Sequence, residues 1–185
     1  MKFLKSWEGK SGLKYLTVLV GGILLRFIPF RAPNLEPVMA STLPFAKKYG
    51  RINAFFFAFL SMVLFDILDG KVGPWTWITA IVYGGIGIGA YYFLKNKSAQ
   101  PLNFLTCSII GTIVYDALTG LTIGPIFFNQ TFAVALAGQI PFTLIHLVGN
   151  SVMALAVSPL IYRWLVLNPK LKTQNAKNYL AVDRL

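Results

Sequence analysis

The stretch RINAFFFAFLSMVLFDILDGKVGPWTWITAIVYGGIGIGAYYFL, residues 51–94, decides the fold class of this chain. It contains two apolar runs, residues 52–68 and 75–94. Each run is near the roughly 20 residues with which a helix crosses the hydrocarbon core of a bilayer. The first run closes with Asp66 and Asp69, and glycine and proline then interrupt the chain. Two runs of this length that meet at a polar break predict a helical hairpin in a membrane.

The composition extends this prediction to the whole chain. Hydrophobic residues make up 56% of the 185 residues and charged residues only 12%, which is more apolar surface than one soluble core of this size could hide. The sequence therefore predicts an all-α membrane protein with a single integral membrane domain, residues 1–185. We expect six transmembrane helices and a basic cytoplasmic tail, residues 168–185. The spans lie at about residues 13–30, 34–46, 52–68, 75–94, 102–118 and 141–167.

The distribution of basic residues predicts the topology. If both termini are cytoplasmic, all but three of the 17 lysines and arginines lie inside, and only Arg26, Arg31 and Lys71 lie outside. This bias is typical of loops that stay in the cytoplasm. The short run at residues 34–46 is counted as a span, because the asymmetry disappears without it. A protein of the cell membrane is expected, and the net charge of +11 indicates attraction to inner-leaflet lipids and not to nucleic acid.

A short internal repeat follows two of the runs. Residues 63–74 read VLFDILDGKVGP and residues 113–125 read IVYDALTGLTIGP, so that Asp66 matches Asp116. In each copy we expect a helix that ends at a left-handed glycine. Two roles are open for the aspartates. They accept hydrogen bonds within the turn that follows, or they line an outward cavity and pair with Arg26, Arg31 or a ligand.

The last run, QIPFTLIHLVGNSVMALAVSPLIYRWLV at residues 139–166, contains unusual polar residues. Pro141 suits the start of a helix, which puts Gln139 at its mouth. His146 and Asn150 are four residues apart and share one helix face. Polar groups at membrane depth need partners, so this face is expected to point into the bundle. Either it fixes helix packing by hydrogen bonds, or it lines a pocket.

The segment FFNQTFAVALAG, residues 127–138, is too long for a tight turn. It predicts a short half-helix over residues 131–137, before the last span, with Thr131 or Asn129 as its N-cap. Such a half-helix would cover the outer mouth of a pocket. The segment at residues 30–34 is expected to form a second lid.

Enzyme classes lack their motifs in this chain. The sequence has no zinc-protease, serine-hydrolase or acidic metal-binding pattern and no cluster of cysteine and histidine. Cys107, the single cysteine, is expected to be a small packing residue. GGIGIGA, residues 84–90, is expected to be a packing surface, because no phosphate-loop lysine follows it. We therefore expect neither an enzyme nor a bound cofactor.

Three stretches together resemble a known family. The pattern RFIPF…APNLEPVMA at residues 26–40, the aspartate-and-glycine helix ends, and PFTLIHLVGN at residues 141–150 are similar to the substrate-binding S components of energy-coupling factor transporters. The resemblance implies a six-helix protein that binds a vitamin or similar micronutrient near the outer face. It also implies a separate partner, a transmembrane coupling protein with two cytoplasmic ATPases.

The resemblance and the polar pattern together give a candidate site and a candidate docking face. Family members dock through small residues four apart on the first helix, which Thr17 with Gly21, or Val18 with Gly22, match in part. The alternative is a non-transporting membrane scaffold, such as a rod-shape-determining membrane protein, which needs no pocket. The candidate substrate-binding residues are Arg31, Asn34, Asp66, Asp69, Asp116, Asn129, Gln130, Gln139, His146 and Asn150.

Overall fold

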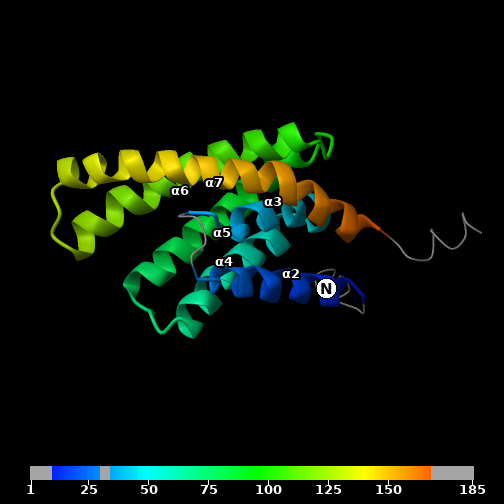
Figure 1. Cartoon of the computed structure of the whole chain (residues 1–185), viewed down its shortest axis with the longest axis horizontal. Helices are drawn as coiled ribbons and strands as arrows, with labels where there is room; N and C mark the ends of the chain where they lie inside the picture. Colours follow the sequence, from blue (N-terminus) through cyan, green and yellow to red (C-terminus); the bar gives the residue numbers. More distant parts are fainter. Residues whose placement is uncertain (1–9, 30–33, 168–185) are drawn as a thin grey trace, which may run out of the picture.

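The computed structural model describes residues 10–29 and 34–167, and within these ranges the chain is all-helical, as the sequence predicts (Figure 1). The described helices are α2 (Lys10–Arg26), α3 (Pro37–Tyr49), α4 (Arg51–Leu68), α5 (Pro74–Leu94), α6 (Pro101–Phe127) and α7 (Phe132–Val166).

Four of these helices, α4 to α7, are long and apolar enough to cross a membrane. The other two are shorter, since α2 has 17 residues and α3 has 13. At 1.5 Å per residue α3 extends only about 20 Å, which is less than the roughly 30 Å of a hydrocarbon core. The helical lengths are thus consistent with a membrane protein, and six complete crossings stay a prediction.

The short helix α3 lies at the centre of the bundle. It contacts all five of the other described helices, and every residue from Pro37 to Ala46 is buried. Pro37 stands in the first turn, where its missing N–H group leaves no hydrogen bond unmade. Ten consecutive buried residues leave no face of these turns exposed, so other helices cover α3 on every side. This central position, and not exposure to lipid, explains how so short a helix is retained.

Two lysines donate hydrogen bonds to the C-terminal carbonyl groups of other helices. Lys14 donates to the carbonyl oxygens of Trp164 at 2.7 Å and Leu167 at 3.0 Å at the end of α7. Lys47 donates to the carbonyl oxygen of Leu94 at 3.0 Å at the end of α5. Cations at helix C-termini satisfy free carbonyl groups and oppose the helix dipole. These contacts bring the basic start of α2 and the ends of α3, α5 and α7 to one end of the bundle (Figure 1), as the charge pattern predicts.

The glycine-rich stretch in α5 presents two different faces. A Cβ atom at Gly84 would lie 2.6 Å from the Phe55 ring, and one at Gly87 would lie 2.7 Å from the Ala54 carbonyl oxygen. These two glycines form a packing surface against α4, as expected. Gly85 and Gly89, on another face, have no neighbouring atom within 4 Å of such a Cβ.

The first copy of the repeat forms the turn that the sequence predicts. Gly70 has a φ of +68°. The N–H of Lys71 donates to the carbonyl of Asp66 at 3.0 Å, and that of Gly70 donates to Ile67 at 3.3 Å. These two bonds form a Schellman motif, which closes a helix with a left-handed residue.

The second copy does not form this turn, and the prediction of a helix end near Leu118 is wrong. Helix α6 continues through Gly120 and Pro125 to Phe127. The first copy has the charged sequence Asp-Gly-Lys at its turn, whereas the second has the uncharged Thr-Gly-Leu at residues 119–121. A glycine between uncharged residues can stay within a helix, where its backbone hydrogen bonds are satisfied without water. The repeat is therefore one of sequence and not of local structure.

The prediction of a separate half-helix before the last span is also wrong. Thr131 is the N-cap, as expected, and its side chain accepts a hydrogen bond from the N–H of Val134 at 3.3 Å. The helix that starts there is α7 itself, which runs for 35 residues and has Pro141 inside it. Neighbouring helices can support a proline within a membrane helix, and α6 lies alongside α7 here. Residues 131–137 are consequently the first turns of a long helix.

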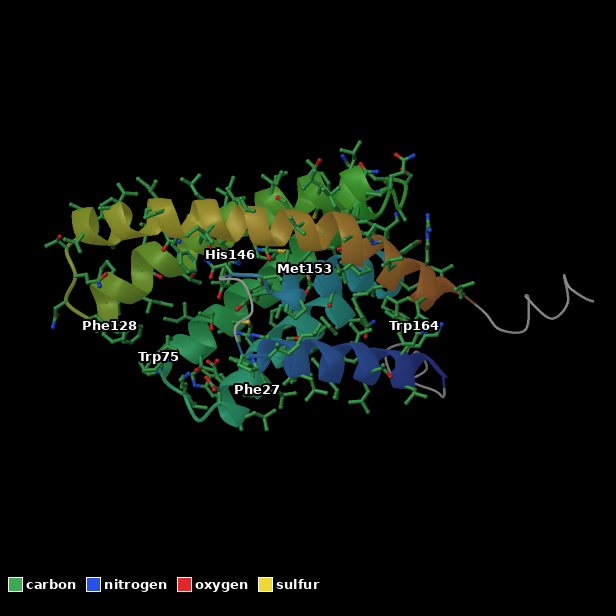
Figure 2. All side chains as sticks on the ribbon, viewed as in Figure 1. Phe27, Trp75, Phe128, His146, Met153 and Trp164 are labelled. Carbon is green, nitrogen blue, oxygen red and sulfur yellow. The ribbon has the colours of Figure 1, made fainter. Side chains whose placement is uncertain are left out.

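The extended parts of α6 and α7 form a hairpin that projects beyond the other helices (Figure 1). Phe128, at its tip, has its ring centroid 5.9 Å from that of Trp75 at the start of α5, and Figure 2 shows these two side chains near the same end of the molecule. This contact joins the tips of the two hairpins, α4–α5 and α6–α7.

Candidate functional site

A buried hydrogen bond between two side chains joins α6 and α7. The Nδ1 atom of His146 is 2.8 Å from Oδ1 of Asp116. Asp116 is 1% exposed and His146 is 3% exposed, and Figure 2 shows His146 in the middle part of α7. Burial of a carboxylate is unfavourable unless it is paired, and the imidazole provides that partner. Because α6 continues as a helix past Asp116, this residue belongs to the bundle interior and not to a turn.

A second polar contact extends the same seam by one helical turn. The side-chain amide of Asn150 donates to Oγ1 of Thr112 at 2.8 Å, and Ser108 donates to the carbonyl oxygen of Asn150 at 3.3 Å. Ser108, Thr112 and Asp116 are spaced by four residues on α6, which places them on one face. Ser108 and Thr112 are not among the predicted site residues, although this spacing is the sequence signal for the α6 side of the seam.

Aromatic rings lie next to the imidazole of His146. The ring centroid of His146 lies 5.5 Å from that of Phe142 and 6.2 Å from that of Tyr115. Tyr83 of α5 lies against Tyr115, with ring centroids 4.5 Å apart. The site therefore combines hydrogen-bonding groups with flat apolar walls. We refer to Tyr83, Thr112, Tyr115, Asp116, Phe142, His146 and Asn150 as the polar cluster.

Several buried polar atoms of this region have no hydrogen-bond partner among the described residues. They are Oη of Tyr83, Oδ2 of Asp116, Oδ1 of Asn150 and Nε of Arg26. An unsatisfied buried polar group typically costs roughly 1–3 kcal/mol. These atoms come from four different helices, α5, α6, α7 and α2, so the bundle interior keeps hydrogen-bonding capacity on several sides.

Arg26, at the end of α2, pairs with Glu36 and with neither of the repeat aspartates. Its Nη2 atom is 3.5 Å from Oε1 of Glu36, and its guanidinium lies 3.6 Å from the ring centroid of Phe65. The carboxylate and the aromatic face together stabilise a cation that is largely buried. The hypothesis that Asp66 or Asp116 pairs with Arg26 is therefore wrong.

The first-copy aspartates serve the turn between α4 and α5. Thr76 donates to Oδ2 of Asp66 at 2.6 Å, while its hydroxyl accepts from the N–H of Gly73 at 3.1 Å. Asp69 forms an ion pair of 2.6 Å with the exposed Lys71. These contacts favour the turn-forming role for both residues, which are not members of the polar cluster.

Three further candidates lie along the projecting hairpin. Asn129, with a φ of +53°, and Gln130 are exposed in the connection from α6 to α7. Gln139 donates to the hydroxyl of Thr143 on its own helix at 3.0 Å and packs against Gly120, where its Oε1 takes the space of a Cβ. Among the described residues no hydrogen bond joins these three residues to His146.

The connection from α2 to α3 reaches the polar cluster at Asn34. A Cβ atom on Gly149 would lie 2.4 Å from the carbonyl oxygen of Asn34, so the chain crosses α7 directly beside Asn150. Asn34 has a φ of +56°, a conformation that asparagine adopts more readily than most residues. Arg31 lies outside the described residues, as does most of the predicted lid at residues 30–34.

The predicted docking residues on α2 point in two directions. Thr17 is exposed and donates to the carbonyl of Leu13 on its own helix at 2.8 Å. A Cβ at Gly21 would meet no atom within 4 Å, whereas one at Gly22 would lie 3.9 Å from Pro37 of α3. Thr17 and Gly21 thus leave an open strip on α2, and Gly22 faces the bundle.

The structure brings together Asp116, His146 and Asn150, with Asn34 beside them, and leaves the other described candidates elsewhere. Comparison with protein-family models, with curated proteins and with solved structures finds no match to this chain.

Proposed function

We propose that this chain is a membrane-embedded solute-binding subunit, similar to an S component, for the uptake of a vitamin or similar micronutrient. In this proposal all six described helices cross the cell membrane, with the termini in the cytoplasm. The ligand binds at the polar cluster. A transmembrane coupling protein with two cytoplasmic ATPases supplies the energy.

The observation that carries the proposal is the set of unpartnered buried atoms around the polar cluster. Oδ2 of Asp116 and Oδ1 of Asn150 accept hydrogen bonds, and the hydroxyl of Tyr83 donates or accepts. A bundle that needed polar groups only for packing would be more stable if each of them were satisfied internally. A small molecule with N–H or O–H groups on its edge would complete these hydrogen bonds.

The surroundings of these atoms support a planar ligand. The rings of Tyr83, Tyr115 and Phe142 lie around the pair of Asp116 and His146. Ligand sites typically combine aromatic walls with a few polar groups that fix orientation. The backbone at Asn34 covers α7 at Gly149, which gives the α2–α3 connection the role of a lid.

The test is to purify the full-length protein in mild detergent and to identify retained metabolites by mass spectrometry. The affinity of the identified metabolite is then measured for the wild type, for Asn150→Ala and for Tyr83→Phe. We expect at least a tenfold loss in Asn150→Ala, because an unpaired polar group in the complex costs roughly 1–3 kcal/mol. Thr106→Val is the matched control, since Thr106 is exposed and its hydroxyl bonds only to its own helix. Equal affinity in all four proteins would contradict the proposal.

A membrane scaffold is the second candidate, and the internal pairing of the cluster favours it. Asp116 with His146, and Asn150 with Thr112, satisfy part of one another's hydrogen-bonding capacity. A scaffold needs these bonds for packing alone. The scaffold gains support if no metabolite is retained and if no candidate vitamin raises the melting temperature of the purified protein.

A further inference from the structure

An apolar groove lies between α5 and α6, on a part of the bundle that the polar cluster does not use. Its volume is about 390 Å³. On α5 it is lined by Gly85 and Gly89, the two glycines that have open space where a Cβ would stand. On α6 it is lined by Cys107, Gly111 and Val114, among other apolar residues. The groove exists because these positions carry small side chains, while Gly84 and Gly87 hold α5 against α4 on another face.

The length of the groove matches one leaflet of a bilayer. On α5 the lining residues extend from Val82 to Phe93, and on α6 from Cys107 to Leu118. Eleven residues of helix rise about 16 Å, and half of a hydrocarbon core is about 15 Å. Both helices are among those long and apolar enough to cross a membrane. On α5 the groove therefore covers the half of the helix that leads to the α5–α6 connection.

The end of the groove that lies nearest the α5–α6 connection carries positive charge. Phe93 lines the groove there, and the ammonium group of Lys97 lies 4.0 Å from the centroid of the Phe93 ring. Lys95 is exposed in the same connection, with its ammonium 5.3 Å from the Tyr92 ring. Lysines immediately beside a membrane helix attract anionic lipid head groups. An apolar channel as long as a single leaflet, with lysines at its surface end, has the chemistry of a phospholipid.

We infer that the groove between α5 and α6 binds one acyl chain of an anionic phospholipid, whose phosphate lies against Lys95 and Lys97. The absence of side chains at Gly85 and Gly89 makes the groove wide enough for the acyl chain. The ring of Phe93 lies where the acyl chain ends and the head group begins. The lipid would fill the space along α5 and α6 without touching the polar cluster.

A transmembrane helix of a partner fits these dimensions less well. A helix with its side chains is about 10–12 Å across, and it would contact α5 and α6 through both leaflets. On α5 the groove occupies only the half of the helix nearest Lys97. Its volume of about 390 Å³ is at the small end of the range for ligand sites, which suits a single hydrocarbon chain.

The test uses the full-length protein in vesicles made of equal parts phosphatidylglycerol and phosphatidylcholine. After extraction in mild detergent, native mass spectrometry counts the lipids that each protein retains. We expect the wild type to retain one phosphatidylglycerol. The variant Gly85→Leu/Gly89→Leu, which fills the groove, should lose it. Gly138→Leu is the matched control, because Gly138 is an exposed helical glycine with no atom within 4 Å of its Cβ position.

A second variant keeps the inference testable even if the leucine variant folds poorly. Lys95→Gln/Lys97→Gln changes only exposed side chains. We expect it to lower the preference for phosphatidylglycerol over phosphatidylcholine by about fivefold per lysine. Equal lipid retention in the wild type and a folded leucine variant would overturn the inference. An unchanged lipid preference in the glutamine variant would also overturn it. So would a complex with another protein that the wild type forms and the leucine variant does not, if the leucine variant still retains its lipid.

Discussion

The imidazole of His146 lies 2.8 Å from the carboxylate of Asp116, and both side chains are almost completely buried between α6 and α7. Thirty residues separate them in the chain, so only the antiparallel packing of the two helices brings them together. The pair is the central contact of the polar cluster, and the first prediction concerns it.

Removal of one partner should be more harmful than removal of both. His146→Leu leaves the carboxylate of Asp116 buried and unpaired, and we expect it to destabilise the protein by about 3–5 kcal/mol. Asp116→Leu/His146→Leu should recover most of that loss, because apolar replacement of a buried pair is often neutral. Thermal unfolding in detergent measures both variants. A double variant less stable than His146→Leu would contradict this account of the pair.

The two aspartates of the α4–α5 turn should differ in their contribution to stability. Asp66→Ala removes the acceptor of the Thr76 hydroxyl and should lower the free energy of unfolding by about 1–2 kcal/mol. Asp69→Ala removes an ion pair with an exposed lysine and should change it by less than about 1 kcal/mol. Melting curves of the two variants, which differ by three positions in the same turn, provide the comparison.

The glycines of α5 should respond oppositely to the same substitution. Gly87→Ala places a methyl group 2.7 Å from the carbonyl oxygen of Ala54, which separates α5 from α4 and destabilises the protein by about 1–3 kcal/mol. Gly85→Ala meets open space and should stabilise the helix by roughly 0.5–1 kcal/mol. Equal melting temperatures for these variants would show that α4 and α5 do not pack as described.

Lys14 should protect the end of α7. In Lys14→Met the carbonyl oxygens of Trp164, Leu165 and Leu167 lose their donor. We expect faster amide hydrogen exchange in the last turn of α7 and a loss of about 1 kcal/mol in stability. Lys48→Met is the control, because Lys48 is exposed at the end of α3. Similar exchange in both variants would remove the capping role of Lys14.

Gly149 should be needed where the backbone at Asn34 crosses α7 beside the polar cluster. Gly149→Ala puts a methyl group 2.4 Å from the carbonyl oxygen of Asn34, so residues 34–36 must move away from α7. If this connection is the lid of the site, ligand dissociation from the variant should be at least tenfold faster, while Gly138→Ala behaves as the wild type. Stopped-flow measurement with the retained metabolite gives the rates.

The lysines of this protein show where charge counting is informative and where it is incomplete. Lys14 and Lys47 lie where helix ends meet at one end of the bundle, whereas Arg26 lies at the opposite end of α2 from Lys14. Which side of a membrane each end faces stays a prediction. Lys14 and Lys47, however, also hold helix ends by direct hydrogen bonds. A count of charges carries no information on such contacts, since they depend on which helix ends meet.

The sequence by itself determined the class of fold and the first turn. Apolar runs of membrane length require helices, because only helices satisfy every backbone group within one segment, and a charged Asp-Gly-Lys turn can end a helix in water. His146 and Asn150 were recognised because their spacing is local to one helix.

Only the tertiary structure decided that α6 passes through Gly120, that α7 continues without a break through Pro141, and that Asp116 faces His146 while Asp66 bonds to Thr76. Glycine and proline end an isolated helix, but a helix packed alongside can support them. The partner of a buried carboxylate is likewise set by which helices lie side by side, and that depends on the packing of the whole bundle around α3.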